Sequence, residues 1–214
     1  KVRKLATEKN IVLIFDECSS GFRETFGGLH KKYSVEPDMA IFGKALGNGY
    51  AITAVIGRRG IMDSAQSTFI SSTFWTERIG PTAALKTLEV MEREKSWEQI
   101  TKTGVNIRKQ WQEIANHNNL KITINGLPAI SSFSINGNYN LKYKTFITQE
   151  MLKVNILSSN LIFSSIKHSY DIVDKYVYEL NEIFSIINKC ENDESNIDHL
   201  LEWPVCHGGF KRLN

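Results

Sequence analysis

Three short apolar runs lie in the first sixty residues, and they constrain the fold more than any other feature of the chain. Residues 11–15 (IVLIF), 38–43 (DMAIFG) and 52–57 (ITAVIG) are rich in aliphatic side chains and do not alternate between apolar and polar positions. This pattern is typical of parallel strands that are covered on both faces. We therefore expect an α/β domain with a mostly parallel sheet.

The sequence pattern changes near residue 100, where we place a domain boundary. Period-two alternation over residues 120–124, followed by a Gly-Leu-Pro turn and the run 129–135, predicts a smaller antiparallel sheet. Amphipathic periodicity predicts helices over residues 80–95, 97–118, 145–157 and 169–188. The predicted domains are the C-terminal part of a large sheet domain (1–100), a small C-terminal α/β domain (101–190) and a tail (191–214).

Composition and charge exclude several classes of protein. With 42% apolar and 23% charged residues, the 214-residue chain is expected to be globular rather than disordered. The 26 basic and 23 acidic side chains are spread along the chain, so we expect no nucleic-acid partner. The apolar run near the start is too short for a signal-peptide core or a membrane span, and no membrane association is expected.

Cysteine usage and the start of the chain give two further expectations. Cys18, Cys190 and Cys206 are widely spaced and form no C-x-x-C pair, which favours reduced thiols and a cytoplasmic location over disulfides or a zinc ribbon. The chain begins at Lys1 without a methionine, and strand-like sequence follows almost at once. We therefore expect that an N-terminal half is missing.

Charged groups follow the first two apolar runs, where the carboxyl ends of parallel strands bind ligands. Asp16 and Glu17 follow the first run, and Lys44 follows the second in the glycine-rich stretch FGKALGNGY. An acid and a lysine at neighbouring strand ends could form a structural ion pair. Alternatively, a desolvated lysine can attack an aldehyde and form a Schiff base, while an aspartate keeps a pyridinium nitrogen protonated. Pyridoxal 5'-phosphate (PLP) requires this tuning.

Three segments together resemble the class III PLP-dependent aminotransferases, and most of all their glutamate-1-semialdehyde 2,1-aminomutase-like branch. They are IVLIFDECSSGFRETFGG, VEPDMAIFGKALGNGY and STFWTERIGPTAALKTLEVME. The resemblance is tight over residues 11–95 and looser from residue 96 onward, and the spacing from Asp16 to Lys44 is that of the family. It implies a fold-type-I PLP transferase, present as part of the large sheet domain and the small C-terminal domain.

The resemblance also implies roles for single residues. Lys44 would hold PLP as a Schiff base and move the substrate proton, and Asp16 would pair with the pyridine nitrogen. Cys18 stands where the family usually has Val or Ile against the ring. Thr73 matches the threonine that reaches the cofactor phosphate of the partner subunit, which implies a homodimer with a shared active site. The predicted site is therefore catalytic Lys44 with Asp16, Cys18 and Thr73 as further cofactor contacts, and no metal ligand.

The predicted activity is amino-group transfer, by an aminotransferase or a 2,1-aminomutase, on a small amino acid, keto or semialdehyde substrate. Two alternatives stay open: a PLP-dependent decarboxylase or racemase on the same scaffold, and a non-catalytic, truncated aminotransferase-like module. The fragment alone is expected to be inactive. Arg23 could bind a substrate carboxylate or form a salt bridge within its loop. His30 and His168 are expected to be structural or solvated, because neither has a second ligand at a useful spacing.

Overall fold

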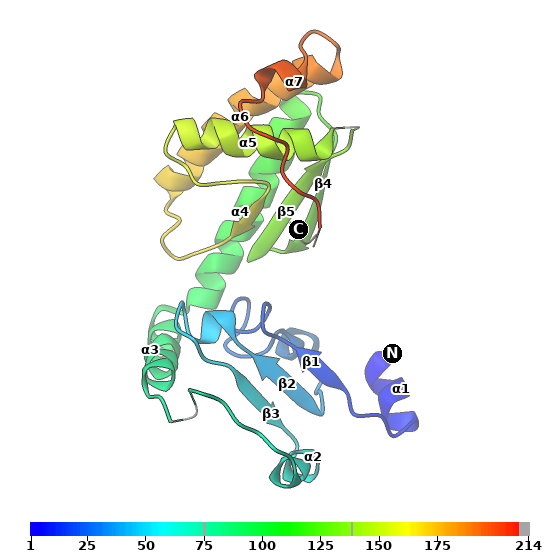
Figure 1. The fold of residues 1–214 in the computed structure, drawn as a ribbon, viewed down its shortest axis with the longest axis vertical. Coiled ribbons are helices and arrows are strands. Elements are labelled where there is room, and N and C mark those ends of the chain that lie inside the picture. Colours follow the sequence, from blue (N-terminus) through cyan, green and yellow to red (C-terminus); the bar gives the residue numbers. More distant parts are fainter. Residues whose placement is uncertain (75, 138, 210–214) are drawn as a thin grey trace. The chain divides into compact units, whose positions relative to one another are not determined.

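The computed structural model describes residues 1–74, 76–137 and 139–209. Trp75, within the third motif, and residues 210–214 of the predicted tail lie outside the described residues. The chain divides into two compact units, unit 1 (Lys1–Gln99) and unit 2 (Ile100–Asn214). Each unit contains a three-stranded sheet with helices (Figure 1), so the α/β class predicted from the sequence is confirmed.

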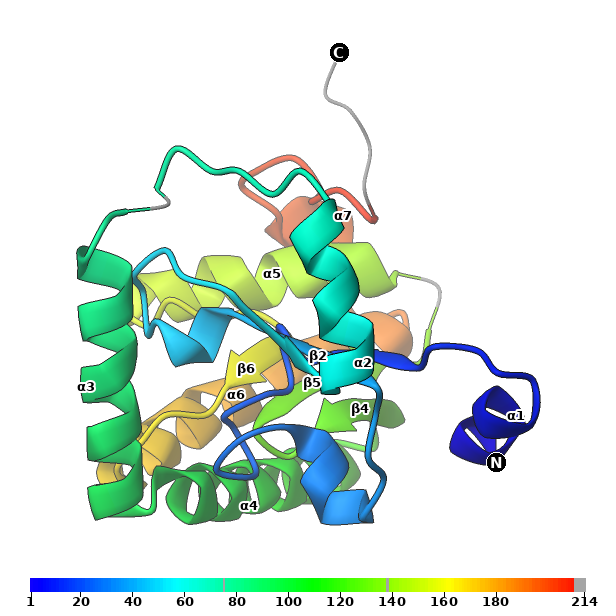
Figure 2. The same cartoon turned by 90° about the horizontal axis from the view of Figure 1, so that it is seen from below.

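Unit 1 consists of a small sheet, helices and short 3-10 turns. The strands, in their order across the sheet, are β1 (Ile14–Asp16), β2 (Met39–Phe42) and β3 (Ala54–Gly57). The helices are α1 (Val2–Glu8), α2 (Arg59–Met62) and α3 (Ile79–Glu94), and the 3-10 turns are Leu29–Tyr33, Lys44–Leu46 and Asp63–Ser67. Figure 2 shows α2 and α3 from a second direction.

The two strands that precede the predicted site residues are parallel, as expected. β1 pairs with β2 in the register that places Asp16 opposite Ile41. β3 runs antiparallel to β2, with Ala54 opposite Phe42, so the expectation that the run 52–57 forms a parallel strand is wrong. The connection between these strands contains only a short 3-10 turn. A parallel pair would need a crossover of about a dozen residues or more, usually with a helix.

A buried carboxylate determines where the first strand begins. The backbone amide of Leu13 donates to Oδ2 of Asp38 at 2.8 Å, and Arg3 from α1 donates to the same oxygen at 2.7 Å. Arg58, directly after β3, lies 3.1 Å from Oδ1. Because the side chain of Asp38 takes the Leu13 amide, the strand begins at Ile14 rather than at Ile11, where we predicted it.

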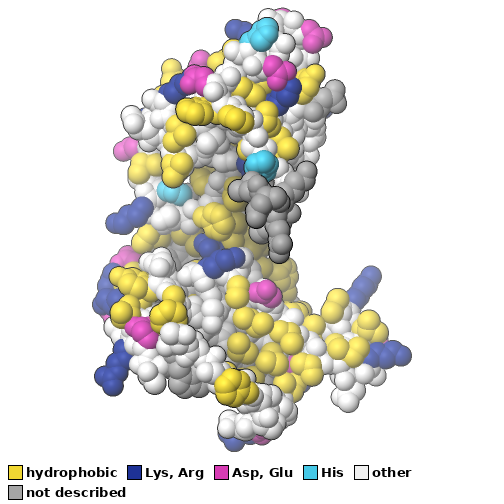
Figure 3. Space-filling model, in the orientation of Figure 1, with side chains coloured by type: hydrophobic (Ala, Val, Ile, Leu, Met, Phe, Trp, Pro, Cys, Tyr) yellow, Lys and Arg dark blue, Asp and Glu magenta, His cyan; other side chains and the backbone are white. Residues whose placement is uncertain are grey.

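Helix α3 covers one side of the sheet in unit 1. Ala40 and Phe42 of β2 pack with Leu46 and with Ala84 of α3 in one buried cluster. The other strands expose apolar side chains, including Ile14 at 49% and Ile56 at 58%. On the face drawn in Figure 3, hydrophobic side chains gather around these strands. The expected cover on both faces is therefore not provided by the described residues of unit 1.

Unit 2 contains the antiparallel sheet that the alternation predicts. Its strands pair in the order β4 (Ile122–Leu127), β5 (Ile130–Ile135) and β6 (Leu161–Phe163), all antiparallel. Its helices are α4 (Ser96–His117), which begins just before the unit boundary, α5 (Asn140–Lys153), α6 (Tyr170–Glu191) and α7 (Ile197–Leu200). Helix α5 begins and ends earlier than the segment 145–157 that the apolar periodicity predicts.

The core of unit 2 is built around aromatic side chains from three elements. Trp111 of α4, Phe133 of β5 and Phe184 of α6 are all at most 1% exposed. Their rings meet edge to face, with centroids 4.8 Å apart for Trp111 and Phe133 and 5.6 Å apart for Phe133 and Phe184. The indole Nε1 of Trp111 donates to the hydroxyl of Tyr176 at 2.9 Å, so the polar atom of the largest core side chain is satisfied.

The described part of the predicted tail docks on helix α5. The Glu202 amide donates to Oε1 of Gln149 at 2.8 Å, and the Cys206 amide donates to Oγ1 of Thr145 at 2.9 Å. Lys153 forms an ion pair with Glu202 at 2.7 Å. The tail is therefore docked on α5 as far as Cys206. Across the described residues, no helix is long and apolar enough to cross a membrane.

A glycine substitution tests how closely α4 approaches the β4–β5 turn. A Cβ on Gly104 would lie 1.8 Å from the carbonyl oxygen of Pro128, whereas a Cβ on Gly60 in α2 would meet no atom within 4 Å. Alanine normally stabilises a helix interior by about 1 kcal/mol relative to glycine. We expect Gly60→Ala to be neutral or stabilising, and Gly104→Ala to lower the free energy of unfolding by about 1–3 kcal/mol through overpacking. Urea denaturation measures both, and a stabilised Gly104→Ala variant would contradict this packing.

Candidate active site

The predicted site lies at the carboxyl ends of β1 and β2. The parallel register continues one residue beyond the ladder, because the Glu17 amide donates to the carbonyl oxygen of Ile41 at 2.8 Å. The chain after β1 and the chain after β2 therefore leave the sheet at the same edge. Asp16 ends β1, and Lys44 begins the 3-10 turn that follows β2.

The turn after β1 faces Lys44 with polar groups. Oδ1 of Asp16 accepts a hydrogen bond from the Cys18 amide at 3.0 Å. The amine Nζ of Lys44 donates to the hydroxyl of Ser19. Arg23 donates from Nε to the Ser19 carbonyl oxygen at 2.7 Å, so its position is set by a contact within the loop. Ser19 is absent from the predicted site, although it lies three residues after Asp16 in the same turn.

The backbone at Lys44 adopts a conformation that L-residues rarely take. Its φ is 40°, in the left-handed region, while Gly43 before it is extended. Two residues of the following turn, Asn48 and Gly49, also have positive φ, of 46° and 104°. Left-handed non-glycine residues cost free energy and cluster at functional sites, where the surrounding structure maintains them. The left-handed backbone of Lys44 is therefore a second feature, besides its amine, that is typical of a functional site.

Cys18 lies beside the same two charged groups. Its thiol is half-buried, and a Cβ built on Gly43 would lie 3.5 Å from Sγ. Burial raises the pKa of the Cys18 thiol, the hydrogen bond and charge of Asp16 raise it further, and the charge of Lys44 partly opposes them. The structure therefore brings Asp16, Cys18 and Lys44 together. Thr73 is exposed in the connection before α3, and no described contact joins it to these three residues.

The structure differs from the sequence prediction on the burial of Lys44. We expect a desolvated amine from the apolar run before it, but both Lys44 and Asp16 are exposed in this chain. The expectation of a dry pocket is wrong for the described residues. The apolar run correctly predicts that β2 is buried, because Ala40 and Phe42 are 3% and 4% exposed. The burial does not extend to Lys44, the first residue of the 3-10 turn that follows β2.

Glu17 has a different environment from its neighbour Asp16. Successive side chains of a strand point to opposite faces, and Glu17 is 3% exposed where Asp16 is exposed. Its Oε2 accepts from the Ser20 hydroxyl at 2.6 Å and from the Leu29 amide at 2.8 Å. Its Oε1 lies 3.0 Å from both the amide and the ring Nδ1 of His30. His30 is buried, which favours the structural one of the two roles expected for it, but its pairing with Glu17 is absent from the predicted site.

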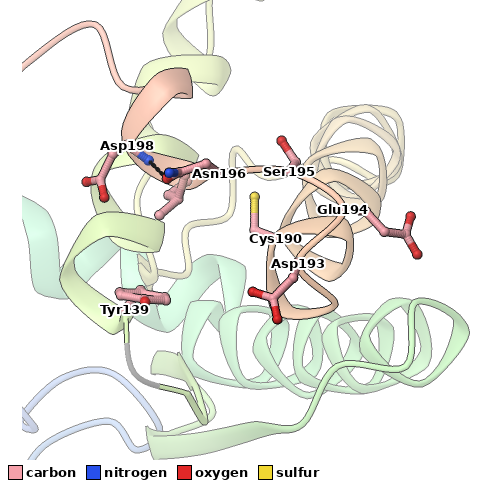
Figure 4. Close-up of a pocket in the computed structure, with 8 residues that line it drawn as sticks. Tyr139, Cys190, Asp193, Glu194, Ser195, Asn196 and Asp198 are labelled. Carbon is pink, nitrogen blue, oxygen red and sulfur yellow. Dashed lines mark hydrogen bonds between the residues drawn. The ribbon is translucent and has the colours of Figure 1, made fainter.

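A pocket in unit 2 lies apart from this group of residues. It is lined by Tyr139 and by the connection between α6 and α7, where Cys190 points toward Ser195 and Asn196 (Figure 4). Its polar groups have structural partners: Asn196 caps α7 by accepting from the Asp198 amide at 2.9 Å, and Asp198 pairs with Lys142 at 2.7 Å. These contacts join the helices, and we assign the pocket no function.

Solved structures define the class of this fold. The FumI protein of Sphingopyxis sp. MTA144, in a PLP-bound form, superposes with a TM-score of 0.83 at 21% identity, covering 93% of this chain and 49% of that one. An S-selective transaminase from an Arthrobacter species superposes with a TM-score of 0.76 at 21% identity, covering 89% and 47%. The chain thus has the fold of the PLP-dependent transferases of fold type I, as predicted.

The sequence defines the family. The sequence model of the family Aminotransferase class-III matches residues 1–175, and the chain belongs to this family of PLP-dependent enzymes. It is 32% identical over 170 residues to a 3-aminobutyryl-CoA aminotransferase of Cloacimonas acidaminovorans, covering 79% of this chain and 41% of the relative. It is 28% identical over 200 residues to a glutamate-1-semialdehyde 2,1-aminomutase of Methanocaldococcus jannaschii, covering 86% and 47%. The chain thus spans less than half the length of each.

The buried carboxylate of Glu17 gives a testable pH dependence. Burial raises its pKa, but the hydrogen bonds from Ser20, His30 and Leu29 outweigh burial and hold the pKa below its ordinary value of 4.5. The unfolded chain therefore binds more protons than the folded chain in acid, and the contribution of Glu17 is present above about pH 5 and lost as the pH falls through the folded-state pKa.

We expect Glu17→Gln to lower the free energy of unfolding at neutral pH and to make it fall less steeply on acidification. Urea denaturation at about pH 7, 5 and 4 measures both effects. The matched control is Glu36→Gln, because Glu36 is exposed and should leave the slope unchanged. Equal slopes for wild type and Glu17→Gln would contradict the lowered pKa.

Proposed function

We propose that the protein to which this chain belongs is a PLP-dependent enzyme that transfers amino groups, with Lys44 as the residue that binds the cofactor covalently. One observation carries the proposal: Asp16 and Lys44 lie at the carboxyl ends of two adjacent parallel strands, at one edge of the sheet. This is where open α/β sheets bind ligands. The class-III family match and the fold-type-I neighbours support the same chemistry.

The donor set at this edge fits the cofactor. A primary amine can bind an aldehyde and a carboxylate can pair with a protonated ring nitrogen, while the half-buried Cys18 side chain can pack against a ring face as a small apolar group. When bound, PLP supplies an electron sink that makes bonds at the amino-bearing carbon easier to break. The exposure of Asp16 and Lys44 leaves both groups accessible to such a ligand.

Each residue then has a distinct task. Lys44 Nζ holds the cofactor and, once released, carries the proton that moves during amino transfer. The Ser19 hydroxyl, which accepts from Nζ, provides a partner for the released amine. Oδ1 of Asp16 accepts from the Cys18 amide, and the exposed carboxylate would accept from the protonated ring nitrogen. Cys18 would fill space against the ring as a small apolar group.

The substrate and the assembly belong to the same proposal. The names of the two sequence relatives, an aminotransferase and an aminomutase, both describe movement of an amino group. We infer a small substrate that carries an amino, keto or semialdehyde group. Thr73 is exposed and has no described contact with the Lys44 group, which is compatible with a role across a homodimer interface, at the cofactor phosphate of the partner subunit.

Reductive trapping tests the role of Lys44. The full-length protein is incubated with PLP, reduced with borohydride, digested and analysed by peptide mass mapping. We expect the pyridoxyl group on the peptide that contains Lys44, and we expect Lys44→Arg to lose it because a guanidinium is not a nucleophile at neutral pH. Lys31→Arg is the matched control, because Lys31 is an exposed lysine of the same unit and should keep the adduct. A folded wild type without an adduct at Lys44 would exclude the proposed function.

A second substitution tests the role of Asp16. Asp16→Asn removes the charge that would hold the ring nitrogen protonated but keeps the shape of the side chain. We expect the dissociation constant for PLP to rise about ten- to a hundredfold, the scale of a lost charge-assisted hydrogen bond. Equilibrium dialysis measures the change, with Asp63→Asn on an exposed 3-10 turn as the control. Unchanged affinity would mean that Asp16 does not contact the cofactor.

A further inference from the structure

Glu17, which follows Asp16 of the proposed site, forms a buried pair with His30. The side chains are 4% and 8% exposed, and ring Nδ1 of His30 is 3.0 Å from Oε1 of Glu17. A carboxylate only accepts hydrogen bonds, so Nδ1 carries the proton and donates. The same oxygen accepts from the His30 amide at 3.0 Å, which makes His30 a two-point contact for one carboxylate oxygen.

The pair closes the loop that connects β1 to the 3-10 turn at residues 29–33. The second oxygen of Glu17 accepts from the Ser20 hydroxyl at 2.6 Å and from the Leu29 amide at 2.8 Å. A Cβ on Gly28 would lie 2.3 Å from the His30 ring, so the backbone approaches this ring as closely as only glycine allows. One carboxylate therefore fixes both ends of the loop.

We propose that Glu17 and His30 are positioning residues for amino transfer, which hold Asp16 and Ser19 facing the amine of Lys44. This proposal rests on the proposed function. Asp16 precedes Glu17 on the opposite face of the strand, and Ser19 precedes Ser20, which donates to Glu17. Asp16 is thus next in sequence to the buried carboxylate itself, and Ser19 is next to Ser20, its hydroxyl donor. A shift of Glu17 therefore displaces both Asp16 and Ser19.

The energetics of burial make the pair act as one unit. If His30 loses its ring donor, the carboxylate of Glu17 stays buried with a missing partner, which is costly enough to rearrange the turn. The rearranged turn no longer presents the Ser19 hydroxyl and the Asp16 carboxylate to Lys44 in the same way. Without the hydrogen bond to Ser19, the amine of Lys44 is no longer held in one position and is more accessible to a reagent in solution.

The test compares two substitutions of His30 in the cofactor-free, full-length protein. His30→Leu keeps the approximate volume and removes the donor, while His30→Asn keeps an N–H close to the position of Nδ1. Acetic anhydride acetylates accessible amines, and peptide mass mapping follows the rate at which Lys44 is labelled at one fixed pH. We expect Lys44 in His30→Leu to react about fivefold faster near neutral pH, the factor that corresponds to one lost hydrogen bond. His30→Asn should restore the wild-type rate to within about twofold.

Asp38→Asn is the control for a merely structural effect. Asp38 is also a buried carboxylate with a backbone amide and arginine partners, but it lies at the opposite end of the same strands. We expect this variant to melt at a lower temperature and to leave the labelling of Lys44 unchanged. Glu17→Gln provides a second test of the pair if His30→Leu does not fold, with faster Lys44 labelling expected. PLP dialysis on the same variants should show weaker binding for His30→Leu and Glu17→Gln, and wild-type binding for His30→Asn and Asp38→Asn.

The outcomes separate this proposal from the proposed function. Wild-type rates and PLP affinity in both His30→Leu and Glu17→Gln would overturn the positioning role, while a Lys44 adduct in the wild type would leave the proposed function intact. If Asp38→Asn accelerates Lys44 labelling as much as His30→Leu, the effect is general destabilisation, and the positioning role is also overturned. A wild type without the pyridoxyl adduct would instead exclude the proposed function, whatever the labelling rates.

Discussion

The parallel pairing of β1 with β2 is the constraint on which the site depends. The register places Asp16 opposite Ile41, and the amide of Glu17 extends it by one hydrogen bond. At the other end of the strands, Asp38 holds the Leu13 amide and two arginines with its buried carboxylate. Because the two strands run parallel in this register, the turns that follow them leave at one edge of the sheet, and Lys44 contacts Ser19 there.

Asp16, a residue of the proposed site, ends β1, and Glu17, the buried carboxylate of the positioning pair, follows it directly. Asp16 is exposed and Glu17 is 3% exposed, because adjacent side chains of a strand point to opposite faces. The two neighbouring acidic residues therefore lie in different environments, and the proposals give them different tasks. Glu17 organises a loop through four donors, and Asp16 keeps an oxygen toward solvent.

The sequence predicts those parts of the structure that local pattern controls. The β1–β2 pairing, the antiparallel sheet of unit 2 and the closeness of Asp16 to Lys44 all follow from apolar runs, alternation and spacing. The direction of β3 and the exposure of Lys44 do not, because they depend on how a short connection closes and on which groups cover the sheet edge. The Glu17–His30 pair joins residues thirteen positions apart, and no periodicity indicates such a contact.

The names of the two sequence relatives describe different reactions. The residues that this chain aligns with in both relatives can therefore explain only what the two reactions have in common. The aminotransferase is 32% identical across 79% of the chain, and the aminomutase is 28% identical across 86%. Moving an amino group requires an amine to hold the cofactor and an acid to keep its ring nitrogen charged, and both reactions need them equally. In the proposed function, Lys44 and Asp16 would supply these two groups. What distinguishes the two reactions would then lie in groups that contact the substrate, and in this chain Cys18 and Ser19 lie beside Lys44.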